Sequence, residues 1–142
     1  MFDLINGLPV HALVVHAVVV LLPLMALLTI VVAVRKNLRE QFSWWVVGAN
    51  GVIFLITLVA KEAGESLQKS LGGQVAQDHG ELGSVLPWFA LFLTLASAAT
   101  AVANRNKALG PIAVVVSIVA AVAAVVWTVR TGDSGARAVW SR

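Results

Sequence analysis

Residues 10–34 read VHALVVHAVVVLLPLMALLTIVVAV and contain no Asp, Glu, Lys or Arg. About 20 apolar residues in a helix span the hydrocarbon core of a bilayer, so this stretch predicts a transmembrane helix. Three further uncharged blocks follow, at residues 44–60, 84–103 and 108–129. Charged residues make up only 12% of the chain, against about 25% in a typical soluble domain. The sequence therefore predicts a single all-α domain over residues 1–142, an integral membrane four-helix bundle.

Composition also excludes several functional classes. The chain has no cysteine, which excludes disulfides, thiolate metal sites, iron–sulfur clusters and covalently attached haem. Four spans leave no room for a soluble catalytic domain, which favours a non-catalytic protein over an enzyme. The formal charge of +3 does not indicate nucleic-acid binding, because the basic residues lie at the predicted membrane boundaries. The first block is longer than the roughly 7–15-residue core of a signal peptide, so we expect it to remain as a span.

The distribution of basic residues predicts the orientation in the membrane. The connectors at residues 35–41 and 104–107 hold five of the ten Lys and Arg residues, and short basic connectors stay in the cytoplasm. Both termini are then extracytoplasmic. The loop at residues 61–83 has a helical composition, with a natural break at Gly72 and Gly73. We therefore expect the second and third helices to extend beyond the membrane as a hairpin.

Two local patterns bear on packing. Asn50 lies inside the second block and is expected to hydrogen-bond a neighbouring helix, while small residues four apart, such as Ser97 and Ala101, allow helices to pack closely. Residues 132–135 spell Gly-Asp-Ser-Gly, as around the nucleophile of trypsin-like proteases, but the two β-barrels that build such a site are absent. We interpret this tetrapeptide as a turn that ends the fourth helix. No internal repeat is evident.

Histidines carry the strongest functional signal. His11 and His16 both lie on the first helix, and His16 is about 7.5 Å deeper. It thus falls within the apolar layer, where a titratable side chain is costly and is a functional candidate by default. The two side chains are roughly 140° apart around the helix and cannot both point squarely at one ion unless the helix bends. They would serve one site as a ligand and a residue that supports it, or two different sites. The alternative is a neutral histidine that hydrogen-bonds a neighbouring helix.

A metal site is one interpretation of these residues. His79 begins the third helix, and Glu62 and Glu65 share a face at the end of the second. Imidazole and carboxylate ligands suit zinc, copper or iron, although the spacing matches no standard motif. The candidate ligands are His11, His16, Glu65 and His79. Alternatively, Lys61 and the glutamates form a solvated helix end.

Haem b held by two histidines is the other candidate cofactor. It requires histidines at matching depth on different helices and an arginine near a propionate. His11 and His79 meet the depth condition better than His16 and His79, and Arg130 or Arg137 supplies the cation. The spacing alone does not require haem.

Four short motifs occur in an order that resembles a known family. The stretch NGLPVHALVVH at residues 6–16 is similar to an opening H-P-L-V-V-H, and AGESL at 63–67 to S-G-E-x-L. HGELG at residues 79–83 is similar to H-A-E-L-G, and the tail at 129–140 to G-H-S-G-A-K-A-V-W. All four belong to a bacterial membrane family known as domain of unknown function 2231. The resemblance implies a multi-pass protein of the bacterial cytoplasmic membrane, considered a possible haem- or metal-binding redox partner.

The chain departs from that pattern at two positions. Ala12 stands where the family has proline, which leaves the first helix free to continue upward. Asp133 stands where a histidine is common. A fourth imidazole is therefore missing, and the resemblance implies a mixed set in which Asp133 joins the metal ligands.

These observations predict a non-catalytic membrane subunit that holds haem b or a metal ion at its extracytoplasmic face. Arg130 would bind a haem propionate or another anion. Besides lipid, the protein would associate with a larger redox or metal-handling membrane complex or form a homo-oligomer. The alternative is an accessory subunit without a cofactor. The cofactor hypothesis requires the imidazoles of His11, His16 and His79 to meet at the extracytoplasmic rim, with His79 within a ligand-bridging distance of the imidazoles on the first helix.

Overall fold

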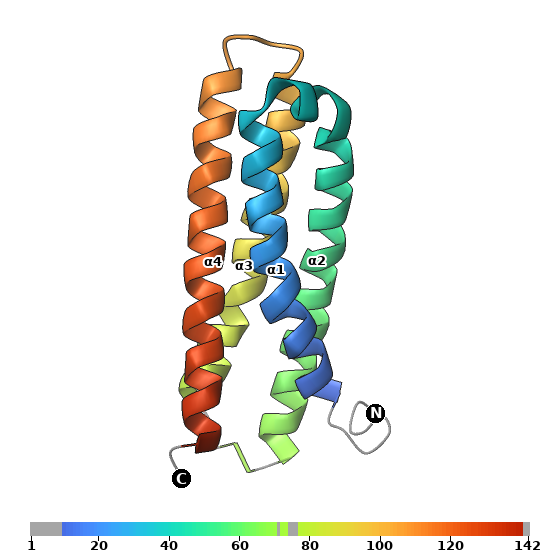
Figure 1. The fold of residues 1–142 in the computed structure, drawn as a ribbon. Helices are drawn as coiled ribbons and strands as arrows, with labels where there is room; N and C mark the ends of the chain where they lie inside the picture. Colours follow the sequence, from blue (N-terminus) through green and yellow to red (C-terminus); the bar gives the residue numbers. More distant parts are fainter. Residues whose placement is uncertain (1–9, 71, 74–76, 141–142) are drawn as a thin grey trace.

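The structure is a computed structural model, and it describes residues 10–70, 72–73 and 77–140. It contains four helices: α1 (Val10–Val34), α2 (Lys36–Ser70), α3 (Gln77–Ala103) and α4 (Gly110–Trp140). They lie side by side and alternate in direction (Figure 1). Each is long and apolar enough to cross a membrane, and the described residues form no strand. The predicted all-α membrane bundle is confirmed.

The helices form a ring in chain order. α1 packs against α2 and α4, α3 packs against the same two helices, and α1 and α3 face each other across the bundle with few contacts. The starts of α1 and α3 and the ends of α2 and α4 therefore meet at one end (Figure 1). We call it the histidine end, because His11 and His79 lie there. The opposite end carries the basic connectors and is called the basic end.

The helical extensions predicted for the second and third helices are present. α2 continues to Ser70, and α3 begins at Gln77. Gly72 and Gly73 adopt φ angles of 87° and 78°, a left-handed conformation that glycine takes without strain. Their amides donate to the carbonyls of Lys69 and Gln68, which is the Schellman termination of α2.

The turn expected at residues 132–135 is wrong, because α4 continues as a helix to Trp140. The Ser134 hydroxyl donates to the Thr131 carbonyl. Asp133 pairs with Arg137 one turn later, at 2.9 Å. These side-chain contacts favour a helix at residues 132–135. The two glycines in the sequence predict a turn because they do not reveal such contacts.

The connector predicted at residues 35–41 is also shorter than expected, since only Arg35 separates α1 from α2. Arg39 donates to the Ala33 carbonyl at the end of α1. It also bonds Asn104 Oδ1 beyond the end of α3. Arg39 thereby ties three helices together at the basic end.

A polar layer crosses the middle of the apolar core. Asn50 is 1% exposed; it donates to Thr29 Oγ1 at 3.0 Å and to Ser97 Oγ at 3.2 Å. The predicted hydrogen bond to a neighbouring helix is confirmed, and it joins α1, α2 and α3. Interhelical hydrogen bonds of this kind help to fix helix pairing within a lipid environment.

Candidate functional site

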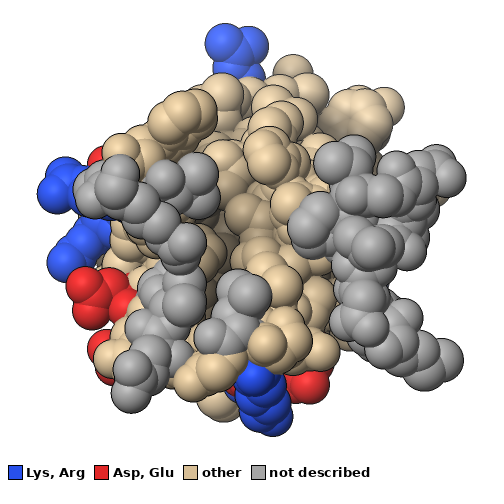
Figure 2. All heavy atoms as spheres, turned by 90° about the horizontal axis from the view of Figure 1, so that it is seen from below, with Lys and Arg blue, Asp and Glu red and all other residues tan. Residues whose placement is uncertain are grey.

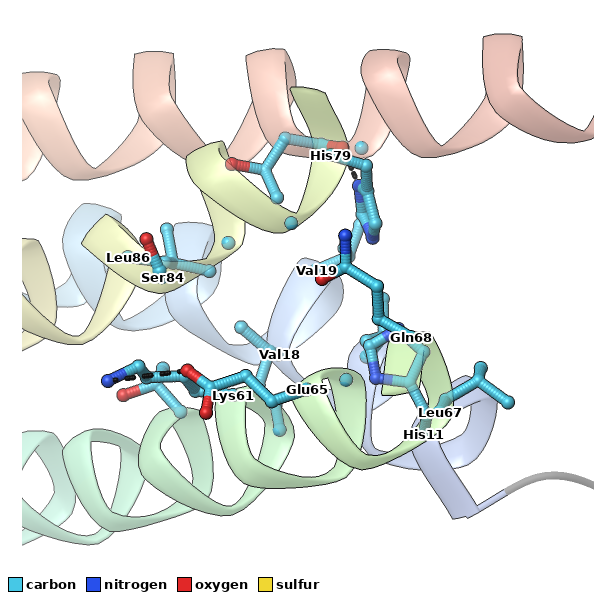
Figure 3. Close-up of a pocket in the computed structure, with 18 of the residues that line it drawn as sticks. His11, Val18, Val19, Lys61, Glu65, Leu67, Gln68, His79, Ser84 and Leu86 are labelled. Carbon is cyan, nitrogen blue, oxygen red and sulfur yellow. Dashed lines mark hydrogen bonds and ion pairs between the residues drawn. The ribbon is translucent and has the colours of Figure 1, made fainter. Parts of the chain in front are cut away.

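Two histidines from different helices meet at the histidine end. His11 lies in the first turn of α1 and His79 in the first turn of α3. Their ring centroids are 6.1 Å apart and the ring planes are inclined at 76°. Figure 3 shows the two side chains at the same end of the cavity. The structure therefore brings together two of the three imidazoles, and we call His11 and His79 the histidine pair.

Each ring of the pair rests on a glycine of the following helix. A Cβ atom on Gly64 of α2 would lie 2.9 Å from Cε1 of His11, and one on Gly135 of α4 would lie 2.9 Å from Cε1 of His79. Separations below 3.0 Å essentially never occur for real Cβ atoms. A Cβ at either glycine would therefore force the ring to shift. The same histidine–glycine contact thus occurs in two halves of the bundle, α1 with α2 and α3 with α4, and the sequence did not reveal it.

Hydrogen bonds orient the ring of His79. Its Nδ1 lies 3.0 Å from the Thr131 carbonyl oxygen and 3.2 Å from Ser134 Oγ. A carbonyl can only accept, so Nδ1 carries the proton and donates. When the ring is neutral, the lone pair is then on the remaining nitrogen, Nε2. Histidines that bind metals usually show this arrangement, with one nitrogen donating to a carbonyl and the other left for the ion.

The ring of His11 has fewer polar contacts. It interacts with the backbone of Ala60, four residues before Gly64, as Thr131 is four residues before Gly135. Within the described chain, however, Nδ1 of His11 is buried without a hydrogen-bond partner. The residue that corresponds to Ser134 is Ala63, which has no hydroxyl. A buried nitrogen without a partner is costly.

A cavity of about 130 Å³ lies beside the pair. All four helices line it, and most of its wall is apolar, with Val18 and Leu86 among the lining side chains (Figure 3). Gln68 of α2 also lines it and was missed from the sequence. Its Oε1 lies 3.0 Å from the position of a Cβ on Gly80, so the amide reaches α3. The sequence could have indicated Gln68, because it lies four residues after Gly64 and therefore on the same face of α2.

The other predicted site residues do not join the pair. His16 is exposed on the outer surface of α1, and its Nδ1 bonds the Ala12 carbonyl of the same helix. Glu65 lines the cavity but pairs with Lys61 at 3.6 Å. No group of three or more His, Asp or Glu side chains that could hold a metal occurs among the described residues.

The predicted residues on α4 lie at the rim. Asp133 pairs with Arg137. The Arg130 guanidinium stands over the Trp127 ring, 5.2 Å from its centroid. Seen from the histidine end, the visible Lys, Arg, Asp and Glu side chains lie at the edge of the molecule (Figure 2).

A family model described as "Predicted membrane protein (DUF2231)" matches residues 7–142. The chain belongs to the DUF2231 family. The resemblance drawn from four short motifs is therefore confirmed. Comparison with curated proteins and with solved structures gives no match. The description of the DUF2231 family states a membrane location and no reaction, so a function for this member has to be argued from the geometry of its histidine pair.

Proposed function

We propose that this DUF2231 protein is a non-catalytic membrane protein that holds one transition-metal ion between His11 and His79. The observation that carries the proposal is the meeting of two imidazoles from separate helices, with ring centroids 6.1 Å apart. Imidazole nitrogen is a good ligand for zinc, copper, iron and nickel. A bound ion would supply a localised positive charge at the histidine end.

The orientation of both rings supports this proposal. The distance from a Gly64 Cβ position to His11 is 3.2 Å for Nδ1 and 3.8 Å for Nε2. For Gly135 and His79 the two distances are 3.1 Å and 3.6 Å. In each ring, Nδ1 therefore lies nearer to the glycine than Nε2 does. These two Nε2 atoms are the ligands that we propose.

The size of the cavity favours an ion over haem b. Pockets for drug-sized ligands measure about 300–1,000 Å³, whereas this cavity is about 130 Å³. A macrocycle between the rings would require the helices to separate. Arg130, the residue proposed for a propionate, stacks on Trp127. An ion requires only small movements of two side chains.

We also propose that a second membrane protein, or a second copy of this chain, covers the outer face of α1. His16 is exposed there within the candidate span His11–Val34. A titratable side chain facing lipid is costly, and a neighbouring helix would remove that cost. This contact would connect the metal site to a larger metal-handling or redox complex.

The test is metal analysis and an absorption spectrum of the full-length protein, purified in detergent from cells that express it natively. We expect about one metal equivalent per chain. The variants His11→Ala and His79→Ala should lose it. His16→Ala is the matched control, because it removes an imidazole from α1 outside the pair, and it should retain the metal.

Two other outcomes would replace the proposal. A Soret band that disappears in His11→Ala and in His79→Ala would identify haem b as the ligand. Absence of both metal and haem, together with one stoichiometric membrane partner in a pull-down, would leave a cofactor-free accessory subunit. Metal that persists in both His→Ala variants would place the site elsewhere.

A further inference from the structure

We infer that the cavity beside the histidine pair binds the head of a lipid-soluble quinol, a single aromatic ring with two hydroxyl groups and an apolar tail. This inference goes beyond the proposed metal ion and does not rest on it. Three observations carry it: the size of the cavity, the hydrogen-bonding character of its wall, and two glycines that line it without a protein contact.

The cavity has the volume of a single ring. It measures about 130 Å³, and an apolar cavity of about 150 Å³ is enough to hold benzene. Most of its wall is apolar, and the imidazoles of the histidine pair add aromatic surface, on which another ring can stack or pack edge-on. Val19 lines the cavity and is also 37% exposed on α1. The cavity therefore adjoins the lipid-facing surface, where an apolar tail can leave it.

The hydroxyl groups of the wall are hydrogen-bond acceptors. Four lining residues carry a hydroxyl, and each hydroxyl donates its proton to a backbone carbonyl of its own helix. These bonds run from Thr57 to Phe54, from Ser84 to Glu81, from Thr128 to Ala124 and from Thr131 to Trp127. A hydroxyl has one proton, so these oxygens have only lone pairs left to offer a ligand.

The other polar groups of the wall add more acceptors than donors. The Glu65 carboxylate accepts, and so does Nε2 of a neutral His79, whose Nδ1 donates to the Thr131 carbonyl. The Lys61 ammonium is already paired with Glu65 at 3.6 Å. The Gln68 amide and a neutral His11 ring each offer both a donor and an acceptor. A ligand that donates hydrogen bonds therefore matches this wall better than one that only accepts them.

The positions of the acceptors favour two hydroxyl groups over one. Thr57 and Glu65 belong to α2, Ser84 to α3 and Thr128 to α4, so acceptors border the cavity on three of its four helices (Figure 3). A benzene-1,4-diol carries its two donors at opposite ends of the ring and can meet acceptors of two helices. A phenolic hydroxyl that donates to a carboxylate also forms a charge-assisted bond, which is stronger than a neutral one.

Two glycines leave space at this wall. Gly83 of α3 and Gly132 of α4 both line the cavity, and an added Cβ at either would meet nothing within 4 Å. Glycine is less favourable than alanine inside a helix, and no protein contact requires it at these positions. Room for a ligand accounts for both glycines.

The experiment is equilibrium dialysis of the full-length, metal-free protein in detergent without oxygen, with detergent alone as the blank. The probe is a benzene-1,4-diol with a short alkyl chain. Its oxidised quinone and its dimethyl ether keep the ring and lose the hydroxyl donors. We expect one diol per chain, with the quinone and the ether bound about 10-fold more weakly because their hydrogen bonds to the wall are missing. A phenol with the same chain and one hydroxyl should fall between them.

Variants locate the bound ring. Gly83→Leu and Gly132→Leu should fill the cavity and lower diol binding, whereas Gly51→Leu, at a position that does not line it, should not. Thr128→Val should weaken binding of the diol and leave that of the dimethyl ether unchanged. Thr94→Val is its matched control, since that hydroxyl also donates to a carbonyl of its own helix but lies outside the cavity wall. Far-ultraviolet circular dichroism verifies that each variant is folded.

The outcomes separate this inference from the proposed function. A quinone or dimethyl ether bound as tightly as the diol would overturn the role of the hydroxyl donors. Diol binding that is unchanged in both leucine variants and in Thr128→Val would overturn the location. Metal analysis of the natively purified protein decides the proposed function separately. Metal without diol binding would overturn this inference alone, and diol binding without metal would overturn the metal site alone.

Discussion

Replacing Gly64 with alanine tests whether the histidine pair depends on the glycines beneath it. The new Cβ would lie 2.9 Å from Cε1 of His11, and ordinary van der Waals contact begins at 3.4 Å. The ring must therefore retreat by about 0.5 Å, since repulsion rises steeply below contact distance. That movement displaces Nε2 from its position opposite His79. Misplacement by such amounts is enough to loosen a preorganised site.

The matched control is Gly51→Ala on the same helix, where an added Cβ meets nothing within 4 Å. Both substitutions gain about 1 kcal/mol of helix propensity, so their difference isolates the clash. Overpacking costs about 1–3 kcal/mol, and we expect a difference near the lower end because an imidazole can rotate aside. The decisive readout is metal affinity, which should fall for Gly64→Ala alone.

The assays are thermal unfolding of the metal-free protein in detergent and a competition titration of the metal. Gly64→Ala should unfold at a lower temperature than Gly51→Ala and bind the metal less tightly. If the two alanine variants match in both measurements, the close approach of His11 to α2 is not required for the site. A loss of affinity in Gly51→Ala would equally contradict the reasoning, because that position touches nothing.

Three further predictions follow from the same contacts. Ser134→Ala should lower metal affinity by about 10-fold, because it removes a hydrogen bond that orients His79. An unchanged affinity in the competition titration would contradict this role of Ser134. Asn50→Ala should lower the free energy of unfolding by about 1–2 kcal/mol through lost interhelical bonds, whereas the exposed Asn37→Ala should not, as measured by denaturant titration in detergent. The chain has no native cysteine, so single cysteines can report the topology. Gln77→Cys should react with an impermeant thiol reagent in intact cells, and Leu109→Cys should not. The reverse pattern would show that the predicted orientation in the membrane is inverted.

Much of the fold could be predicted because membrane spans are encoded locally. The four uncharged blocks identified all four helices, and Gly72 and Gly73 marked the hairpin turn. The end of α4 could not be predicted in the same way. Gly132 and Gly135 carry the signal of a turn, but Gly135 is needed to admit the ring of His79. A glycine required by a long-range contact cannot be distinguished locally from one that ends a helix.

The site was predictable in part for a related reason. The 140° offset between His11 and His16 indicated that only one of them could face a given ion, and the structure places His11 beside His79. The carboxylates could not be assigned, since Glu65 can face either the cavity or Lys61 on the same helix. Its ion pair with Lys61 depends on side-chain orientation, which helical spacing alone leaves open.

A difference at one position between the two halves explains why the histidine pair is asymmetric in its hydrogen bonds. In each half a histidine that begins one helix rests on a glycine near the end of the next, and the backbone contact lies four residues before that glycine. The halves differ where Ser134 in one corresponds to Ala63 in the other. His79 is therefore held by a hydroxyl and a carbonyl, while Nδ1 of His11 has no partner in the described chain. One fixed imidazole and one adjustable imidazole allow the pair to close on an ion, because His11 can move toward it without breaking a strong hydrogen bond.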